Sequence, residues 1–266
     1  MEKDAAVSDD LVLYERRGAV ALITINRPRT LNALDMEMLA ALDARVAAAE
    51  ADDAVRVVVF TGAGRAFVAG GDIADLNARQ GLPHYQELAE RLHRVFRRIE
   101  TCDKPTIAAI NGFALGGGTE LLLCMDLRIA AASAKLGLPE ITLGLFPGAG
   151  GSQRLMRQLP LCKAKEMMFL GSRITAAEAE RLGLINRVVE DAALLDEVFV
   201  TADAIAQKSS LVLKLLKRTM ADGADMPLPS ALRHEQAMIS LVFDSADAHE
   251  GCTAFLQKRA AAFHGR

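Results

Sequence analysis

The chain has 266 residues, of which 51% are hydrophobic, and its 31 basic and 34 acidic side chains give a formal net charge of −3. This apolar content is enough for a sizeable core and argues against a disordered protein. Because charges of both signs are mixed along the chain, we expect neither a nucleic-acid-binding surface nor a charged tail. The length fits one large domain or two modest ones.

Neither the cysteines nor the histidines form a pattern typical of a metal site. The four cysteines lie far apart, without a CxxC pair, at Cys102, Cys124, Cys162 and Cys252. We therefore expect buried free thiols in a reducing compartment rather than disulfides or a metal centre. The five histidines show no ligand spacing either.

Targeting and membrane signals are also missing from the sequence. The first ten residues, MEKDAAVSDD, are acidic and lack the apolar stretch of a secretory signal. No apolar run approaches the roughly 18 residues that cross a bilayer. The sequence therefore predicts a cytoplasmic protein with no membrane partner.

The N-terminal part reads as strands alternating with helices. Periodicity and turn residues predict, in chain order, two strands, a helix, a third strand and a long helix, at 11–15, 20–26, 36–49, 55–61 and 84–101. Asp35 can cap the first helix. The third strand is a continuous β-branched run, which is typical of a strand buried on both faces.

The stretch 104–151 carries the residues that are best suited to chemistry. A buried strand over 106–110 leads into three glycines, 116–118, and then into a helix over 119–125. The first N–H groups of a helix have no partner within the helix, so they can stabilise a developing oxyanion such as an enolate.

Two carboxylates flank these glycines, Glu120 in the first helical turn and Glu140 directly after Pro139. A catalytic pair is one interpretation. The other is structural, with a glycine turn, an acid that complements the helix dipole and a solvated loop acid. The spacing alone leaves both interpretations open.

Beyond the central stretch the sequence becomes helical. Helices are predicted over 151–158 and 161–170, and Thr175 with Glu178 forms a capping-box signature for a helix that ends at Gly183. A short strand over 184–189 follows. After about residue 191 only amphipathic helices are predicted, at 194–207, 211–220, 230–242 and 246–262.

Two ordered segments carry a resemblance to a known family. NGFALGGGTELLLCMDLRIA (111–130) and KLGLPEITLGLFPGAGGSQRL (135–155) resemble the enoyl-CoA hydratase/isomerase (crotonase) family. The resemblance implies an α/β fold, with a spiral of strand–strand–helix units over 1–190 and a helical C-terminal region over 191–266. In the family this region packs against neighbouring subunits, which implies a homotrimer or a homohexamer.

The resemblance also implies the residues of a substrate site. The backbone N–H groups of Gly71 and Gly117 would hold a thioester carbonyl as an oxyanion hole. The same implication extends to substrate-contacting residues in the first glycine loop and in the C-terminal motif FLQKR, namely Ala69, Asp72, Ile73, Phe255 and Lys258. Ala74 departs from relatives that carry Lys there, so a cation near the coenzyme phosphates must come from elsewhere.

The implied reaction is addition of water to a 2-enoyl-CoA thioester, with Glu120 and Glu140 managing the water and the α-carbon proton. Which of the two is the acid stays open, because the reverse reaction exchanges their roles. No metal or redox cofactor is implied, since coenzyme A is part of the substrate.

Several other functions are compatible with the same fold. Single-carboxylate isomerases lack the earlier glutamate, and dehalogenases carry an Asp at the place of Gly148. A catalytically silent or RNA-binding scaffold would need degraded carboxylates or a basic surface, and the sequence shows neither. Methylglutaconyl-CoA and carnitinyl-CoA chemistry would use the same residues, so the acyl group stays open.

Overall fold

Two β-sheets form the centre of the protein, whose computed structural model describes residues 10–79 and 81–266. The larger sheet has the strand order β1-β2-β3-β5-β7-β10 and the smaller sheet the order β4-β6-β8-β9. The strands, in chain order, are β1 Val12–Arg17, β2 Val20–Ile25, β3 Val57–Gly62, β4 Ala66–Val68, β5 Thr106–Ile110, β6 Phe113–Leu115, β7 Leu127–Ala131, β8 Lys135–Gly137, β9 Arg173–Thr175 and β10 Arg187–Val189.

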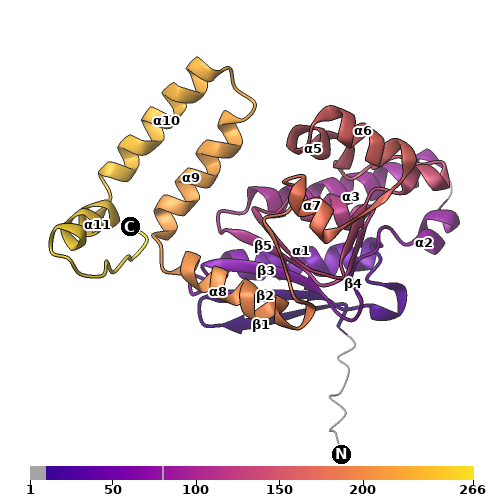
Figure 1. Ribbon diagram of the computed structural model, residues 1–266, viewed down its shortest axis with the longest axis horizontal. Helices are drawn as coiled ribbons and strands as arrows, with labels where there is room; N and C mark the ends of the chain where they lie inside the picture. Colours follow the sequence, from indigo (N-terminus) through magenta and orange to yellow (C-terminus); the bar gives the residue numbers. More distant parts are fainter. Residues whose placement is uncertain (1–9, 80) are drawn as a thin grey trace, which may run out of the picture.

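The helices lie around these sheets (Figure 1). They are α1 Met36–Ala51, α2 Ile73–Ala78, α3 Leu82–Thr101, α4 Gly117–Leu122, α5 Gly151–Gln158, α6 Leu161–Leu170, α7 Ala176–Arg181, α8 Leu194–Ala206, α9 Ser210–Gly223, α10 Leu228–Phe243 and α11 Ala246–Leu256, with short 3₁₀ turns η1 Pro28–Thr30, η2 Glu140–Leu143 and η3 Asp191–Ala193. As predicted, Asp35 caps α1, because its side chain accepts the N–H of Met38 at 2.8 Å.

The chain repeats one unit, in which a strand of the large sheet is followed by a strand of the small sheet and then by helical structure. β3 and β4, β5 and β6, and β7 and β8 are three such pairs, and equivalent strands of successive pairs lie parallel. This confirms the predicted spiral of strand–strand–helix units and the mixed α/β class.

The large sheet is buried on both faces. Along β3, Val58 and Phe60 pack into the core on the side of α1 and α3, whereas Val57 and Val59 pack into a second core beneath α8. Successive side chains of a strand point to opposite faces, so a continuous apolar run fills both cores.

The helices after α8 form an arm (Figure 1), and ion pairs of Lys217 with Asp126 and of Arg218 with Asp103 connect α9 to the rest of the chain. α9 and α10 lie side by side and project from the sheets, and neither contains a buried residue. By contrast, α8 packs on the large sheet through Leu194, Val198 and Ala202. The domain boundary after residue 190 stays a prediction, and the projecting part begins at α9.

The last helix is shorter than predicted. The sequence pattern predicts a helix over 246–262, but α11 ends at Leu256 and Lys258 adopts a left-handed φ of 55°. The reason is local, since Glu250 accepts hydrogen bonds from Arg259 and from the Ala262 N–H, which turns the chain back on itself.

Predictions on thiols were partly correct. All four cysteines are free, and Cys102 and Cys124 are buried, but Cys162 and Cys252 are exposed on α6 and α11, so the prediction of buried thiols is wrong for these two. Within 10–79 and 81–266, no group of three or more His, Cys, Asp or Glu side chains could hold a metal ion. Over the same residues, no helix is both long and apolar enough to cross a bilayer.

Candidate active site

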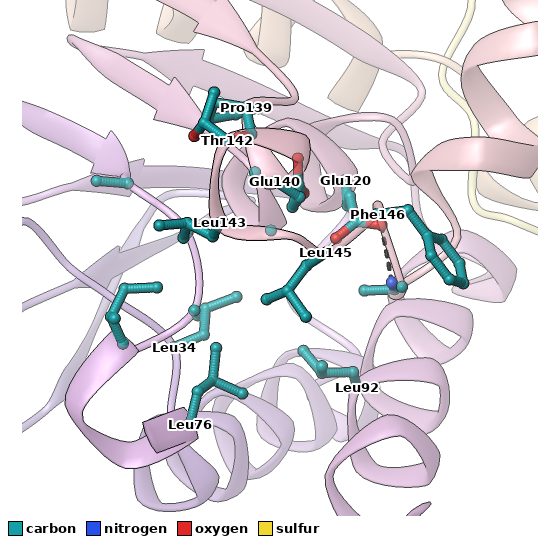
Figure 2. A pocket seen from close by; sticks show the side chains of 18 of the residues that line it. Leu34, Leu76, Leu92, Glu120, Pro139, Glu140, Thr142, Leu143, Leu145 and Phe146 are labelled. Atoms are coloured by element: carbon teal, nitrogen blue, oxygen red, sulfur yellow. Dashed lines mark hydrogen bonds between the residues drawn. The ribbon is translucent and has the colours of Figure 1, made fainter. Parts of the chain in front are cut away.

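A cavity of about 400 Å³ lies where the chain leaves the strands of the small sheet. Its walls come from the loops after β4, β6 and β8 and from α2, α3 and η2. Apolar side chains dominate, and Figure 2 shows several of them around the hollow, with Glu120 and Glu140 on one side of it. The apolar lining consists of Leu34, Ala69, Ile73, Leu76, Leu88, Leu92, Pro139, Leu143, Leu145, Phe146 and Ala149.

Gly71 contributes a free backbone N–H to the cavity wall. The Leu34 N–H donates to the Gly70 carbonyl and the Asp72 N–H donates to the Leu34 carbonyl, both at 2.8 Å. This parallel bridge pairs Leu34 with Gly71 but leaves the Gly71 N–H outside the pairing. The side chain of Asp72 then caps α2 by accepting the N–H groups of Ala74 and Asp75, which fixes the direction of the chain after Gly71.

Gly117 lies directly beside this loop. It is the first residue of α4, so its N–H has no acceptor within the helix. Gly116 before it has a φ of 52°, a left-handed conformation that favours glycine. An added Cβ on Gly117 would lie 3.7 Å from the Gly71 nitrogen, which shows how closely the two backbone segments approach.

Glu120 is almost completely enclosed, with 3% of its surface exposed. Its Oε1 atom accepts the N–H groups of Ala149 and Gly151, each at 2.7 Å. Burial raises the pKa of this carboxyl to about 7, and the nearby charge of Glu140 adds to the rise, although the two N–H groups and Arg154 oppose it. No donor among the described residues contacts Oε2, so that oxygen is available to a ligand in the cavity.

Glu140 is the first residue of η2 and lines the same cavity. Both of its carboxylate oxygens are buried, and neither has a hydrogen-bond partner in the part of the chain that the structure describes. Burial raises the pKa of Glu140 above its usual range. A buried carboxyl without a hydrogen-bond partner destabilises the folded protein. We therefore expect a ligand in the cavity to supply the hydrogen-bond partner of Glu140.

The structure brings most of the predicted site residues together. Gly71, Gly117, Glu120 and Glu140 line one cavity, together with the predicted contacts Ala69 and Ile73. Asp72 does not line it and acts as the cap of α2.

Phe255 and Lys258 do not reach this cavity within one chain. They lie at the end of α11, on the projecting arm, and Phe255 is 83% exposed (Figure 1). Within one chain, α9 and α10 carry them away from the sheets. Their contact with the substrate stays a prediction, which concerns an assembly of several chains.

Other functional positions were not found from the sequence. Leu88 and Leu92 of α3 line the cavity, and their spacing of four residues was a signal for one helix face but not for a binding site. Arg173 of β9 also lines it. Ala149 and Gly151 hold Glu120 through backbone N–H groups. Every residue type except proline has such a group, so the sequence carries no signal for this contact.

Comparisons with known proteins show the family of the chain. Residues 15–266 match the family model described as enoyl-CoA hydratase/isomerase. Crotonyl-CoA hydratase of Syntrophomonas wolfei is 42% identical over 95% of this chain and 97% of its own length. Short-chain-enoyl-CoA hydratase of Clostridium acetobutylicum is 39% identical over 93% and 95%. The crystal structure of enoyl-CoA hydratase from Bacillus anthracis covers 96% of this chain and 100% of its own, with 36% identity and a TM-score of 0.93. The chain belongs to the enoyl-CoA hydratase/isomerase family.

Proposed function

We propose that this protein is an enoyl-CoA hydratase, which adds water across the 2,3 double bond of a 2-enoyl-CoA thioester. The observation that carries the proposal is the placement of two buried carboxylates, Glu120 and Glu140, on one cavity with two free backbone N–H groups. The similarity to relatives named as hydratases supports the same reaction.

The oxyanion hole is formed by Gly71 and Gly117. The thioester carbonyl oxygen accepts both N–H groups, and negative charge collects on this oxygen as the nucleophile attacks C3. Fixed donors stabilise that charge without reorganising, and loss of one such donor typically costs about 3 kcal/mol in the transition state. Glycine suits both positions because the substrate must approach the backbone closely.

The two glutamates handle the water. One water molecule binds between the Oε2 atom of Glu120 and the unpartnered carboxyl of Glu140. Its hydroxyl oxygen forms a bond to C3, and a proton is delivered to C2, so that the elements of one water are added and nothing else is consumed. No metal or redox cofactor takes part, and coenzyme A serves as the handle of the substrate.

The raised pKa values fit this division of labour. Burial raises the pKa of both carboxyls, and the charge of Glu140 adds to the rise at Glu120, whose pKa of about 7 lets it take up or give up a proton near neutral pH. Such a carboxyl can serve as an acid or as a base. The roles of acid and base exchange when the reaction runs backwards as a dehydration.

The apolar lining of the cavity favours an aliphatic acyl group. Its far wall consists of leucines from α2, α3 and the loop after η2, including Leu76, Leu92 and Leu145 (Figure 2). Burial of an aliphatic chain there contributes roughly 0.8 kcal/mol per methylene.

The active assembly is a homotrimer or a homohexamer. The groove between α9 and α10 is apolar and open, and large side chains such as Met220, Leu228 and Leu232 are exposed in it. Exposed apolar surface of this extent usually marks an interface. The arm that carries Phe255 and Lys258 would then extend toward the cavity of a neighbouring subunit.

A substrate panel tests the function directly. The protein is incubated with 2-enoyl-CoA thioesters of increasing chain length, with branched and dicarboxylic analogues, and with a 3-enoyl-CoA thioester. Formation of 3-hydroxyacyl-CoA from short 2-enoyl substrates is expected. Conversion of the 3-enoyl thioester without any hydration would instead identify an isomerase, and no turnover of any thioester would identify a silent scaffold.

A further inference from the structure

One part-buried ion pair lies directly behind the loop that holds Glu120. The guanidinium of Arg154 on α5 forms a two-pronged contact with Glu100 in the last turn of α3. Its Nε donates to Oε1 and its Nη2 donates to Oε2, both at 2.8 Å. The side chain of Arg154 is 15% exposed and that of Glu100 31% exposed, so the pair is largely shielded from water.

Arg154 is also bonded to the loop itself. Its Nη1 donates to the carbonyl of Ala149 at 3.1 Å, and the N–H of the same residue donates to Glu120 at 2.7 Å. A continuous chain of hydrogen bonds therefore runs from Glu100 through Arg154 and Ala149 to the carboxyl of Glu120. The guanidinium also packs closely against the loop backbone, because an added Cβ on Gly150 would lie 1.9 Å from Nη1 of Arg154.

The pair also sets the charge that faces Glu120. Titratable or charged groups reach its surroundings from four segments, namely Glu140 of η2, Arg154 of α5, Cys124 of the turn after α4 and, behind Arg154, Glu100 of α3. Arg154 lowers the pKa of Glu120 against the effect of burial. Glu100 neutralises part of that positive charge, so the two residues of the pair act on Glu120 in opposite directions.

We propose that Glu100 and Arg154 are positioning residues for Glu120, which fix the orientation of its carboxyl through Ala149 and adjust its readiness to give up a proton. The proposal rests on the proposed function, since it concerns a carboxyl of the same site. Neither residue lines the cavity, so neither touches the substrate.

Three variants separate the charge of the pair from its geometry. Arg154→Met removes the positive charge and the bond to Ala149. Glu100→Gln is nearly isosteric and removes only the negative charge, which leaves Arg154 in place. Arg154→Lys keeps the charge but cannot reproduce the two-pronged contact. Arg157→Met, on the same helix but with a 58% exposed side chain, is the matched control.

The expected changes in proton affinity have opposite signs. Arg154→Met raises the titration midpoint of Glu120 by at least about half a pH unit, and Glu100→Gln lowers it by a smaller amount, because Glu100 acts from behind Arg154. Arg154→Lys leaves the midpoint close to that of the wild type. In that variant kcat falls roughly tenfold or more while KM changes little, because the carboxyl is no longer held in one orientation. A residue needed only for folding would not shift the two midpoints in opposite directions.

The test is a carboxyl ¹³C NMR titration of the full-length protein labelled at the side-chain carboxyl of glutamate, with Glu120→Gln to assign the signal. Opposite shifts in Arg154→Met and Glu100→Gln, with none in Arg157→Met, support the proposal. Unchanged midpoints, or shifts of the same sign, overturn it. The pH profile of kcat/KM should move in the same directions. Because the titration needs no turnover, an inactive wild type with opposite shifts would refute the hydratase function and leave the positioning role intact.

Discussion

The Oε1 atom of Glu120 accepts the backbone N–H of Gly151 at 2.7 Å, and this contact leaves no room for a side chain at residue 151. An added Cβ on Gly151 would lie 2.8 Å from Cγ of Glu120 and 3.0 Å from Cβ of Pro147. The carboxyl of Glu120 and the start of α5 are therefore fitted to each other.

Gly151→Ala should displace Glu120 and slow catalysis. A misplacement of about 1 Å at a reacting group can cost roughly a hundredfold in rate, so we expect kcat to fall by about that factor with little change in KM. Steady-state kinetics on a short 2-enoyl-CoA measures it. Gln153→Ala, an exposed position on the same helix, is the control. Normal kcat in Gly151→Ala would show that the position of Glu120 is not critical.

Glu120→Gln should stabilise the fold in a pH-dependent way. Because burial raises the pKa of Glu120 from 4.5 to about 7, the unfolded carboxyl ionises first as the pH rises. The contribution of this carboxyl to the free energy of unfolding is therefore fully present below pH 4.5 and is lost as the pH rises to about 7. Glutamine does not titrate, so the variant does not lose this stability, which is on the order of 3 kcal/mol. Its amide oxygen still accepts both N–H groups.

Urea unfolding at pH 5 and pH 8 checks this prediction. The advantage of Glu120→Gln over the wild type should be small at pH 5 and clear at pH 8. Glu87→Gln, an exposed position on α3, should show no such trend. An equal difference at both pH values would mean that Glu120 is ionised in the folded protein throughout this range.

Assembly should depend on the groove between α9 and α10. We expect light scattering to give the mass of a trimer or a hexamer. Leu232→Glu places a charge in the groove and should favour monomers, whereas Gln236→Glu, on the same helix outside the groove lining, should not. A monomeric wild type at micromolar concentration would contradict the proposed assembly.

The C-terminal arm should contribute to coenzyme binding in the assembled protein. If Lys258 reaches the phosphates of coenzyme A bound to a neighbour, Lys258→Ala should weaken binding of free coenzyme A roughly tenfold, the loss of one charged hydrogen bond. Calorimetry measures it, with Lys165→Ala on the exposed face of α6 as the control. Undiminished affinity would remove Lys258 from the site without affecting the cavity residues.

The sequence predicted the parts of the site that depend on local chain geometry. A strand that ends in glycines and opens a helix was visible at 116–118, and the position of Glu120 in the first turn followed from it. The resemblance added the pairing with Gly71 and Glu140. Periodicity also predicted most long helices and the buried strands β3 and β5 to within two residues.

Contacts between distant segments could not be predicted in the same way. Ala149 and Gly151 donate backbone N–H groups to a carboxyl 29 and 31 residues earlier, and a backbone donor is independent of residue type. The strands of the small sheet have three residues each, which is too short for an alternating pattern to be recognised. The end of α11 depends on the contact between Glu250 and Arg259, which interrupts an otherwise helical pattern.

The pair Glu120→Gln and Glu140→Gln tests the central claim most directly, because a hydratase must hold one water and move protons at two atoms. Both amides keep the shape of the side chain, so binding of a thioester should change little. We expect each variant to hydrate a short 2-enoyl-CoA at least about a hundredfold more slowly than the wild type. Normal hydration by Glu120→Gln, with an inactive Glu140→Gln, would contradict the two-carboxylate account and favour an isomerase.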